Sequence, residues 1–148
     1  MIRMPLRSCL LVFASTLAVA PAAMAAPTPV GTLPCAIEMP AGWTLNDQKT
    51  RVELTAPGNA VSISVIKNTF SVADSRKQWT PMLKGVKELE NTSERWWVEA
   101  DNDRRSMAGM QKYVAIVGKG STGCLLEAYL KPAAKASVDA AIHSFVAQ

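Results

Sequence analysis

The strongest constraint on the fold is a pair of long apolar segments near the end of the chain, residues 110–117 and 124–130, joined by a turn rich in Gly and Ser. In residues 110–117 apolar side chains occupy both alternating faces, which is typical of a strand covered from two sides. In residues 124–130 apolar side chains recur at every second position, the period of a strand. The two segments therefore predict a hairpin at the centre of an antiparallel sheet.

Shorter segments with the same two-residue period predict further strands. Pro57-Gly58-Asn59 is a turn signal, so the segments on either side of it should form a hairpin. The predicted strands are residues 35–39, a short extended piece that opens at Trp43, and residues 51–56, 61–67 and 95–100.

Apolar residues at steps of three and four predict a helix after the first hairpin. The residues of this stripe are Trp79, Met82, Leu83, Val86 and Leu89. Two starts are compatible with the sequence. Ser71 with Asp74 could form a capping pair, in which case Pro81 should kink the helix, while Thr80 before Pro81 suits a later start.

A second amphipathic helix is predicted at the end of the chain. Ser137 is the expected N-cap, and Asp139 would lie close to the positive end of the helix. Val138, Ile142 and Phe145 share one face and should pack on the sheet.

The expected order is thus three strands, a helix, three strands and a helix (βββαβββα). Turn-joined strands with helices packed on them predict the α+β class, with a mostly antiparallel sheet of about six strands and two helices. We expect one domain at residues 35–148, preceded by a Pro-rich, extended and loosely held lead at residues 26–34.

Residues 1–25 have the pattern of a cleaved export signal. Arg3 and Arg7 form a basic start, residues 10–20 are apolar, and Ala23-Met24-Ala25 offers small residues at the cleavage site. The apolar stretch is shorter than the roughly 20 residues that cross a bilayer core, so a retained membrane span is the weaker alternative. The prediction is a periplasmic or secreted protein that begins at Ala26.

Two cysteines remain after the signal, Cys35 and Cys124, and they predict a disulfide because exported chains meet an oxidising environment. Two buried thiols are the alternative, and a redox pair is disfavoured because the chain has no Cys-x-x-Cys spacing. Cys9 lies before the apolar part of the signal, so it is not a lipidated cysteine and the chain is not expected to be a lipoprotein.

Several motifs together resemble the PsbP-like α/β sandwich family of bacterial envelope proteins, which includes the DcrB-type proteins. They are Pro40-Ala41-Gly42-Trp43 after a short strand, the hairpin of residues 51–67, the helix with Trp79, the final hairpin, and a terminal helix ending at Ser144-Phe145. The resemblance implies a binding or assembly module without a common active site. Some members are cytoplasmic chaperones for type VI effectors, and this chain departs from them by its signal and cysteine pair.

The sequence does not support the main classes of chemistry. His143 is the only histidine and lies off the buried stripe of the last helix, where a surface residue is expected. The chain lacks a Gly-x-Ser-x-Gly elbow and the short Cys and His spacings of zinc sites, and Asp101-Asn102-Asp103 lacks the rest of a calcium loop. The basic residues are scattered, unlike a nucleic-acid-binding stripe. No enzyme activity, cofactor, metal or nucleic acid is therefore expected.

Trp97 is the side chain that most suggests a binding surface. Trp96 and Trp97 should point to opposite faces of their strand, so one enters the core and the other needs separate cover. Trp97 with Arg104 and Arg105 could anchor a protein partner, since Trp and Arg are enriched at binding hot spots. The alternative is that Trp97 packs beneath a helix on the second face of the sheet.

The leading functional expectation is a non-catalytic module that binds another envelope protein, for example an immunity or inhibitor protein. The second is a carrier for a small apolar ligand in a pocket between sheet and helix, suggested by Met82, Leu83, Met107 and Met110. The third, a hydrolase-type enzyme, would depend on His143.

Overall fold

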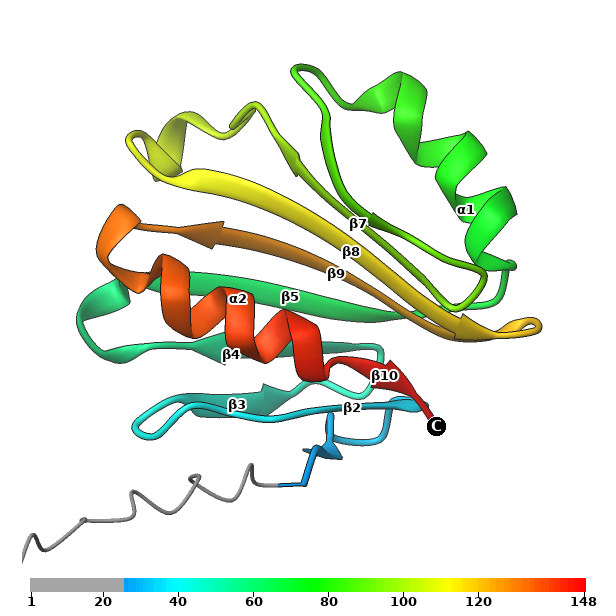
Figure 1. The fold of residues 1–148 in the computed structure, drawn as a ribbon. Helices are drawn as coiled ribbons and strands as arrows, with labels where there is room; N and C mark the ends of the chain where they lie inside the picture. Colours follow the sequence, from blue (N-terminus) through cyan, green and yellow to red (C-terminus); the bar gives the residue numbers. More distant parts are fainter. Residues whose placement is uncertain (1–25) are drawn as a thin grey trace, which may run out of the picture.

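The computed structural model describes residues 26–148, and the predicted signal peptide at residues 1–25 lies outside this range. The strands form two antiparallel sheets (Figure 1). The larger has the order β3-β4-β5-β9-β8-β7-β6. Its strands are β3 (Thr44–Asp47), β4 (Arg51–Thr55), β5 (Val61–Asn68), β6 (Lys87–Asn91), β7 (Arg95–Ala100), β8 (Gln111–Lys119) and β9 (Thr122–Leu130).

The smaller sheet has three strands in the order β1-β2-β10. It consists of β1 (Thr28–Pro29), β2 (Cys35–Ile37) and β10 (Val146–Ala147). Val30 and Leu33, in the lead segment, are buried in the main core. Residues 26–34 are therefore part of the folded body, and the expectation that they are loosely held was wrong.

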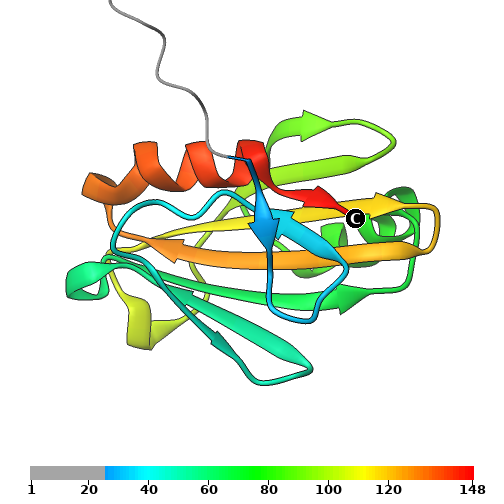
Figure 2. The same cartoon turned by 90° about the horizontal axis from the view of Figure 1, so that it is seen from below.

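The two helices lie on opposite faces of the large sheet. Helix α2 (Lys135–Ser144) and the three-stranded sheet cover one face, and α1 (Val72–Trp79) covers part of the other. Figure 2 shows α2, in orange and red, on one side of the sheet. We call these the α2 face and the α1 face. The α+β class and the single domain body agree with the sequence-based expectation.

The predicted central hairpin is confirmed. β8 pairs with β9 from Gln111 opposite Leu130 to Lys119 opposite Thr122, which leaves a two-residue turn at Gly120 and Ser121. Alternate residues of both strands pack on the two faces, so each strand is covered from both sides. A strand with this position needs apolar residues on both faces, as the sequence indicated.

The main core lies on the α2 face. The stripe of α2 enters it as predicted, because Val138, Ile142 and Phe145 are fully buried. A smaller core lies on the α1 face beneath Val72 of α1. Its members are Val72, Trp96, Val98, Val114, Ile116 and Leu125.

Of the two starts that the sequence allowed for the first helix, the structure has the one at Ser71, but the helix does not continue along the predicted stripe beyond Trp79. Helix α1 begins after Ser71, whose hydroxyl accepts a hydrogen bond from the Asp74 N–H, and it ends at Trp79. A short 3-10 turn, η2 (Thr80–Met82), follows, and the chain then continues to strand β6. Pro81 and Gly85, whose φ is +59°, interrupt helical backbone there.

The start of α2 also differs from its prediction. The short turn η4 (Pro132–Ala134) leads directly into Lys135, so the N-cap is Ala134 and makes no side-chain hydrogen bond. Ser137 is therefore inside the helix. Asp139 lies beyond the first turn, and its carboxylate accepts a hydrogen bond from Lys135 at 2.7 Å.

Candidate functional site

The structure does not bring Trp97, Arg104 and Arg105 together in one patch. Trp97 is 4% exposed and belongs to the core of the α2 face. Arg104 lies on the α1 face, where it pairs with Glu127 at 2.7 Å and stacks over the Tyr129 ring. The alternative considered for Trp97, burial beneath a helix, is the observed arrangement.

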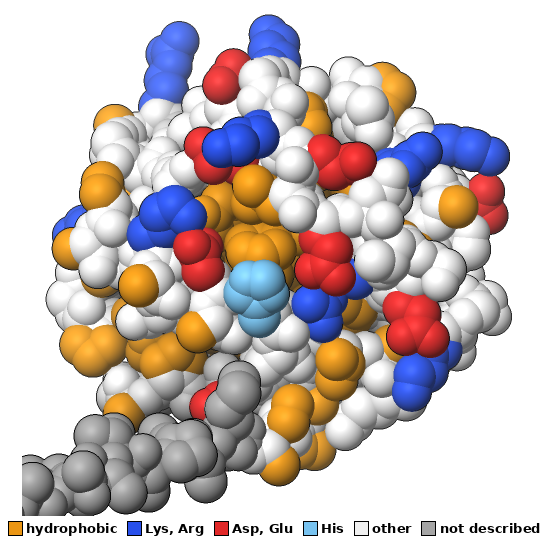
Figure 3. Space-filling model, in the orientation of Figure 1, with side chains coloured by type: hydrophobic (Ala, Val, Ile, Leu, Met, Phe, Trp, Pro, Cys, Tyr) orange, Lys and Arg blue, Asp and Glu red, His pale blue; other side chains and the backbone are white. Residues whose placement is uncertain are grey.

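Trp97 lies in an aromatic cluster beneath α2. Its ring meets Tyr113 edge-on at 5.5 Å between centroids and His143 edge-on at 5.0 Å. Figure 3 shows the histidine beside a recess in which hydrophobic side chains gather, with acidic and basic side chains around it. His143 itself is exposed, as expected, and its position is explained by packing on Trp97.

Two members of the cluster beneath α2, Trp97 and Tyr113, are closed to solvent. Trp97 Nε1 and Tyr113 Oη are buried and make no hydrogen bond within residues 26–148. Burial raises the pKa of the Tyr113 hydroxyl, and the hydrogen bond from Lys135 to Asp139 raises the pKa of Lys135. Tyr113 and Lys135 therefore keep their protons at neutral pH.

The predicted disulfide is present. Cys35 in β2 and Cys124 in β9 are joined, with their Cα atoms 6.2 Å apart and 89 residues between them in sequence. Both side chains are fully buried in the core of the α2 face. The bond ties the small sheet to the large one.

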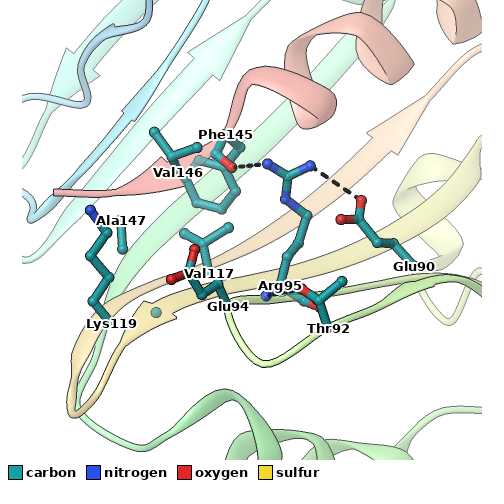
Figure 4. A pocket seen from close by; sticks show the side chains of 10 residues that line it. Glu90, Thr92, Glu94, Arg95, Val117, Lys119, Phe145, Val146 and Ala147 are labelled. Atoms are coloured by element: carbon teal, nitrogen blue, oxygen red, sulfur yellow. Dashed lines mark hydrogen bonds and ion pairs between the residues drawn. The ribbon is translucent and has the colours of Figure 1, made fainter.

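A cleft of about 330 Å³ lies where β6 and β7 approach the end of α2 (Figure 4). The half-buried Arg95 crosses it, donating to Glu90 at 3.2 Å and to the Phe145 carbonyl at 2.9 Å. These bonds connect the β6–β7 hairpin to the chain after α2. We interpret Arg95 as a structural residue, because its guanidinium already holds a carboxylate and a carbonyl.

A charged network lies on the α1 face, near the first residues of β8. Lys112 is almost fully buried in β8, and its ammonium contacts Asp103 at 2.9 Å and Glu127 at 3.4 Å. Tyr129 donates a hydrogen bond to Asp103 at 2.8 Å. The network lets polar side chains occupy a sheet face that no helix covers at this point.

The network also changes the proton affinities of its members. The hydrogen bond from Lys112, followed by that from Tyr129, lowers the pKa of Asp103. Burial lowers the pKa of Lys112, but the hydrogen bond to Asp103 and the charge of Glu127 outweigh it, so its pKa is raised. The pair is therefore fully charged at neutral pH.

The largest cavity described, about 850 Å³, lies at the end of the sheet where three short turns meet. The turns are η1 (Pro57–Asn59), η3 (Arg105–Met107) and η4 (Pro132–Ala134), and Figure 2 shows them together at one end of the molecule, coloured teal, yellow-green and orange. We call this cavity the methionine groove. Its walls include Val61, Met107, Ala108, Met110, Lys131 and Pro132.

The groove contains two of the four residues that the sequence suggested for an apolar pocket. Met107 and Met110 line it, whereas Met82 and Leu83 line a separate cavity of about 440 Å³ beside Asp103 and Lys112. Sequence reasoning missed Val61 and Lys131, because their places in the groove depend on how distant turns meet. Arg105, a predicted partner residue, is exposed in η3 next to the groove.

Among residues 26–148 there is no group of three or more His, Cys, Asp or Glu side chains arranged to hold a metal ion. No helix in that same range has the length and hydrophobicity needed to cross a membrane.

Comparison with known proteins identifies the fold. No family model and no curated protein matches the chain. Among solved structures, cyanobacterial PsbP (CyanoP) from Synechocystis sp. PCC 6803 matches with a TM-score of 0.56 and 11% identity, over 89% of this chain and 99% of that one.

A crystal structure from Bacteroides thetaiotaomicron VPI-5482 also matches, with a TM-score of 0.56 and 10% identity over 78% of this chain. This chain spans only 45% of the length of the Bacteroides protein. The cyanobacterial match covers most of this chain and nearly all of the other, so the chain has a PsbP-like fold.

Proposed function

We propose that this chain is a non-catalytic protein-binding module that works in the periplasm or outside the cell, as an accessory or an immunity-type protein. The methionine groove carries the proposal. It is the largest cavity described, it is mainly apolar, and Arg105 lies next to it. Apolar pockets beside arginines are typical receptors for the anchor side chains of a protein partner.

The side chains of the groove suit this role. Met107 and Met110 are half-buried, and methionine adapts to partners of different shape because its side chain is flexible and polarizable. The disulfide supports an exported protein, because such bonds persist in oxidising compartments. Intact mass of protein isolated from its host tests both cleavage before Ala26 and the presence of the disulfide.

The non-catalytic part of the proposal is supported by the surroundings of His143. Its observed aromatic neighbour is Trp97, and no hydrogen bond joins it to a serine, threonine or acidic side chain within residues 26–148. To act as a general base, a histidine must lie within hydrogen-bond reach of the group whose proton it takes, either a nucleophilic side chain or the substrate.

The test is a pull-down from periplasmic extract with three forms of residues 26–148: the natural chain, Met107→Asp and Met82→Asp. Met82 is the matched control, because it is an exposed methionine that does not line the groove. The same partner should be recovered by the natural chain and Met82→Asp and lost with Met107→Asp. Equal recovery by folded Met107→Asp, checked by circular dichroism, contradicts the proposal.

A second candidate is a carrier for a small apolar ligand. The volume of the groove favours it, because about 850 Å³ lies within the range of roughly 300 to 1,000 Å³ that small-molecule sites occupy. Native mass spectrometry of protein purified from its own host should then show an added mass that Met107→Asp lacks. If the spectrum shows only the mass of the protein and the pull-down recovers a partner, the protein-binding role is favoured.

A further inference from the structure

The lining of the methionine groove carries a positive charge. Lys131 is the one ionisable residue in its lining, and its ammonium makes a single long contact, 3.4 Å, with the Gly58 carbonyl. Neither Lys131 nor the exposed Arg105 forms an ion pair within residues 26–148. Two cations beside an apolar surface thus lack carboxylate partners in the described part of the chain.

Polar side chains on the groove walls are also available for hydrogen bonding. Asn59, Ser62 and Ser106 line the groove. None of the three has a side-chain hydrogen bond to another residue of the described range. An extended peptide carries a donor and an acceptor on every non-proline residue and can use such groups, whereas a hydrocarbon chain cannot.

We propose that the occupant of the groove is a peptide segment of a protein partner in which an apolar side chain is flanked by acidic ones. This rests on the protein-binding function proposed above. The apolar side chain lies against Met107, Met110 and Pro132, and the carboxylates reach Lys131 and the neighbouring Arg105. Complementary charge at such a groove selects partners and speeds their association.

Fluorescence anisotropy with three labelled peptides tests this occupant directly. Each peptide has the same central phenylalanine, flanked by aspartates, by asparagines or by lysines. The natural protein should bind the aspartate peptide about three- to tenfold more tightly than the asparagine peptide, since the two ion pairs are each worth a few-fold in affinity. The lysine peptide should bind most weakly, and added salt should reduce the difference.

Lys131→Glu should abolish or reverse this preference. Lys119→Glu is the matched control, because it changes the net charge equally but lies at the opposite end of β8 and β9. The proposal is supported if Lys119→Glu binds the three peptides with the same order of affinities as the natural protein and Lys131→Glu binds them in a different order. An unchanged order in Lys131→Glu overturns it.

Two further outcomes separate this inference from the proposed function. Equal binding of all three peptides, weakened by Met107→Asp, overturns the acidic-segment proposal while leaving an apolar protein-binding groove intact. Binding of dodecanoate with no binding of any peptide overturns the peptide occupant and favours the carrier function. The pull-down with Met107→Asp tests the protein-binding function separately, because it does not depend on which of the peptides or dodecanoate binds.

Discussion

The two faces of the seven-stranded sheet are covered in different ways. On the α2 face, a helix and a second sheet bury a continuous apolar core that contains the disulfide. On the α1 face, a short helix covers a small apolar cluster and a charged network lies beside it, while the methionine groove lies at one end of the sheet. The larger apolar core and the disulfide therefore lie on one face, and the buried charges of the network lie on the other.

The largest effect that tests this division is removal of the disulfide. The double change Cys35→Ala and Cys124→Ala should lower the free energy of unfolding by about 4 kcal/mol, because the unfolded chain regains the freedom of a long loop. Urea denaturation measures the loss. Beyond this global loss, hydrogen exchange should show an extra loss of protection in β2 and β10, because the bond also holds the small sheet against β9; the absence of an extra loss there would contradict the division.

A matched pair of isoleucines in β5 compares the faces directly. Ile63 is 1% exposed in the core of the α2 face, and Ile66 is half-buried beside the cluster of the α1 face. Ile63→Ala should cost about 3 kcal/mol, since it leaves a cavity, and Ile66→Ala about 1 kcal/mol. Urea denaturation of both variants checks this, and equal costs would show that the α1 face is packed as firmly as the other.

The smallest effect concerns the charged network of the α1 face. The lowered pKa of Asp103 means that its charge stabilises the fold above its ordinary pKa of 3.8 and that this stabilisation is lost as the pH falls through the lower folded value. Asp103→Asn should cost less than about 1 kcal/mol near neutral pH, because the carboxylate is mostly exposed.

The difference between the natural chain and Asp103→Asn should disappear in acid, below the lowered pKa of Asp103. Unfolding titrations at neutral and acidic pH measure it. Asp101→Asn is the control, since Asp101 forms no ion pair within the described residues and its change should have little effect at either pH. A persistent difference in acid would mean that Asp103 acts through packing or hydrogen bonding and not through charge.

The strands were predictable because burial on a sheet leaves a two-residue period in the sequence. This held for β8 and β9, where burial on both faces left apolar side chains at nearly every position. It failed for β6, whose residues 87–91 are mostly exposed and carry no apolar period. The apparent helical stripe at Met82, Val86 and Leu89 arose by chance, since all three are exposed.

The candidate site was less predictable than the fold. Met107, Met110 and Arg105 were singled out from the sequence, but Val61 and Lys131 joined them only through the meeting of three turns far apart in the chain. The alternation of Trp96 and Trp97 was correct, yet sequence order alone did not reveal that Arg104 lies on the opposite face from Trp97. Which side chains are buried depends on the layer that covers each face. That layer comes from segments far away in the sequence, so local sequence patterns do not reveal it.

The small sheet joins the two ends of the described chain, since Val146 of β10 lies opposite Ala36 of β2 and the Gln148 N–H donates to the Pro34 carbonyl. Pairs so distant in sequence form late in folding, because a long loop must close before any contact compensates for it. Cys35 and Cys124 are fully enclosed once this layer is in place, and an oxidant needs access to a thiol. An oxidant can therefore reach these sulfurs only before the small sheet closes or while it is open, so the small sheet controls access to the disulfide.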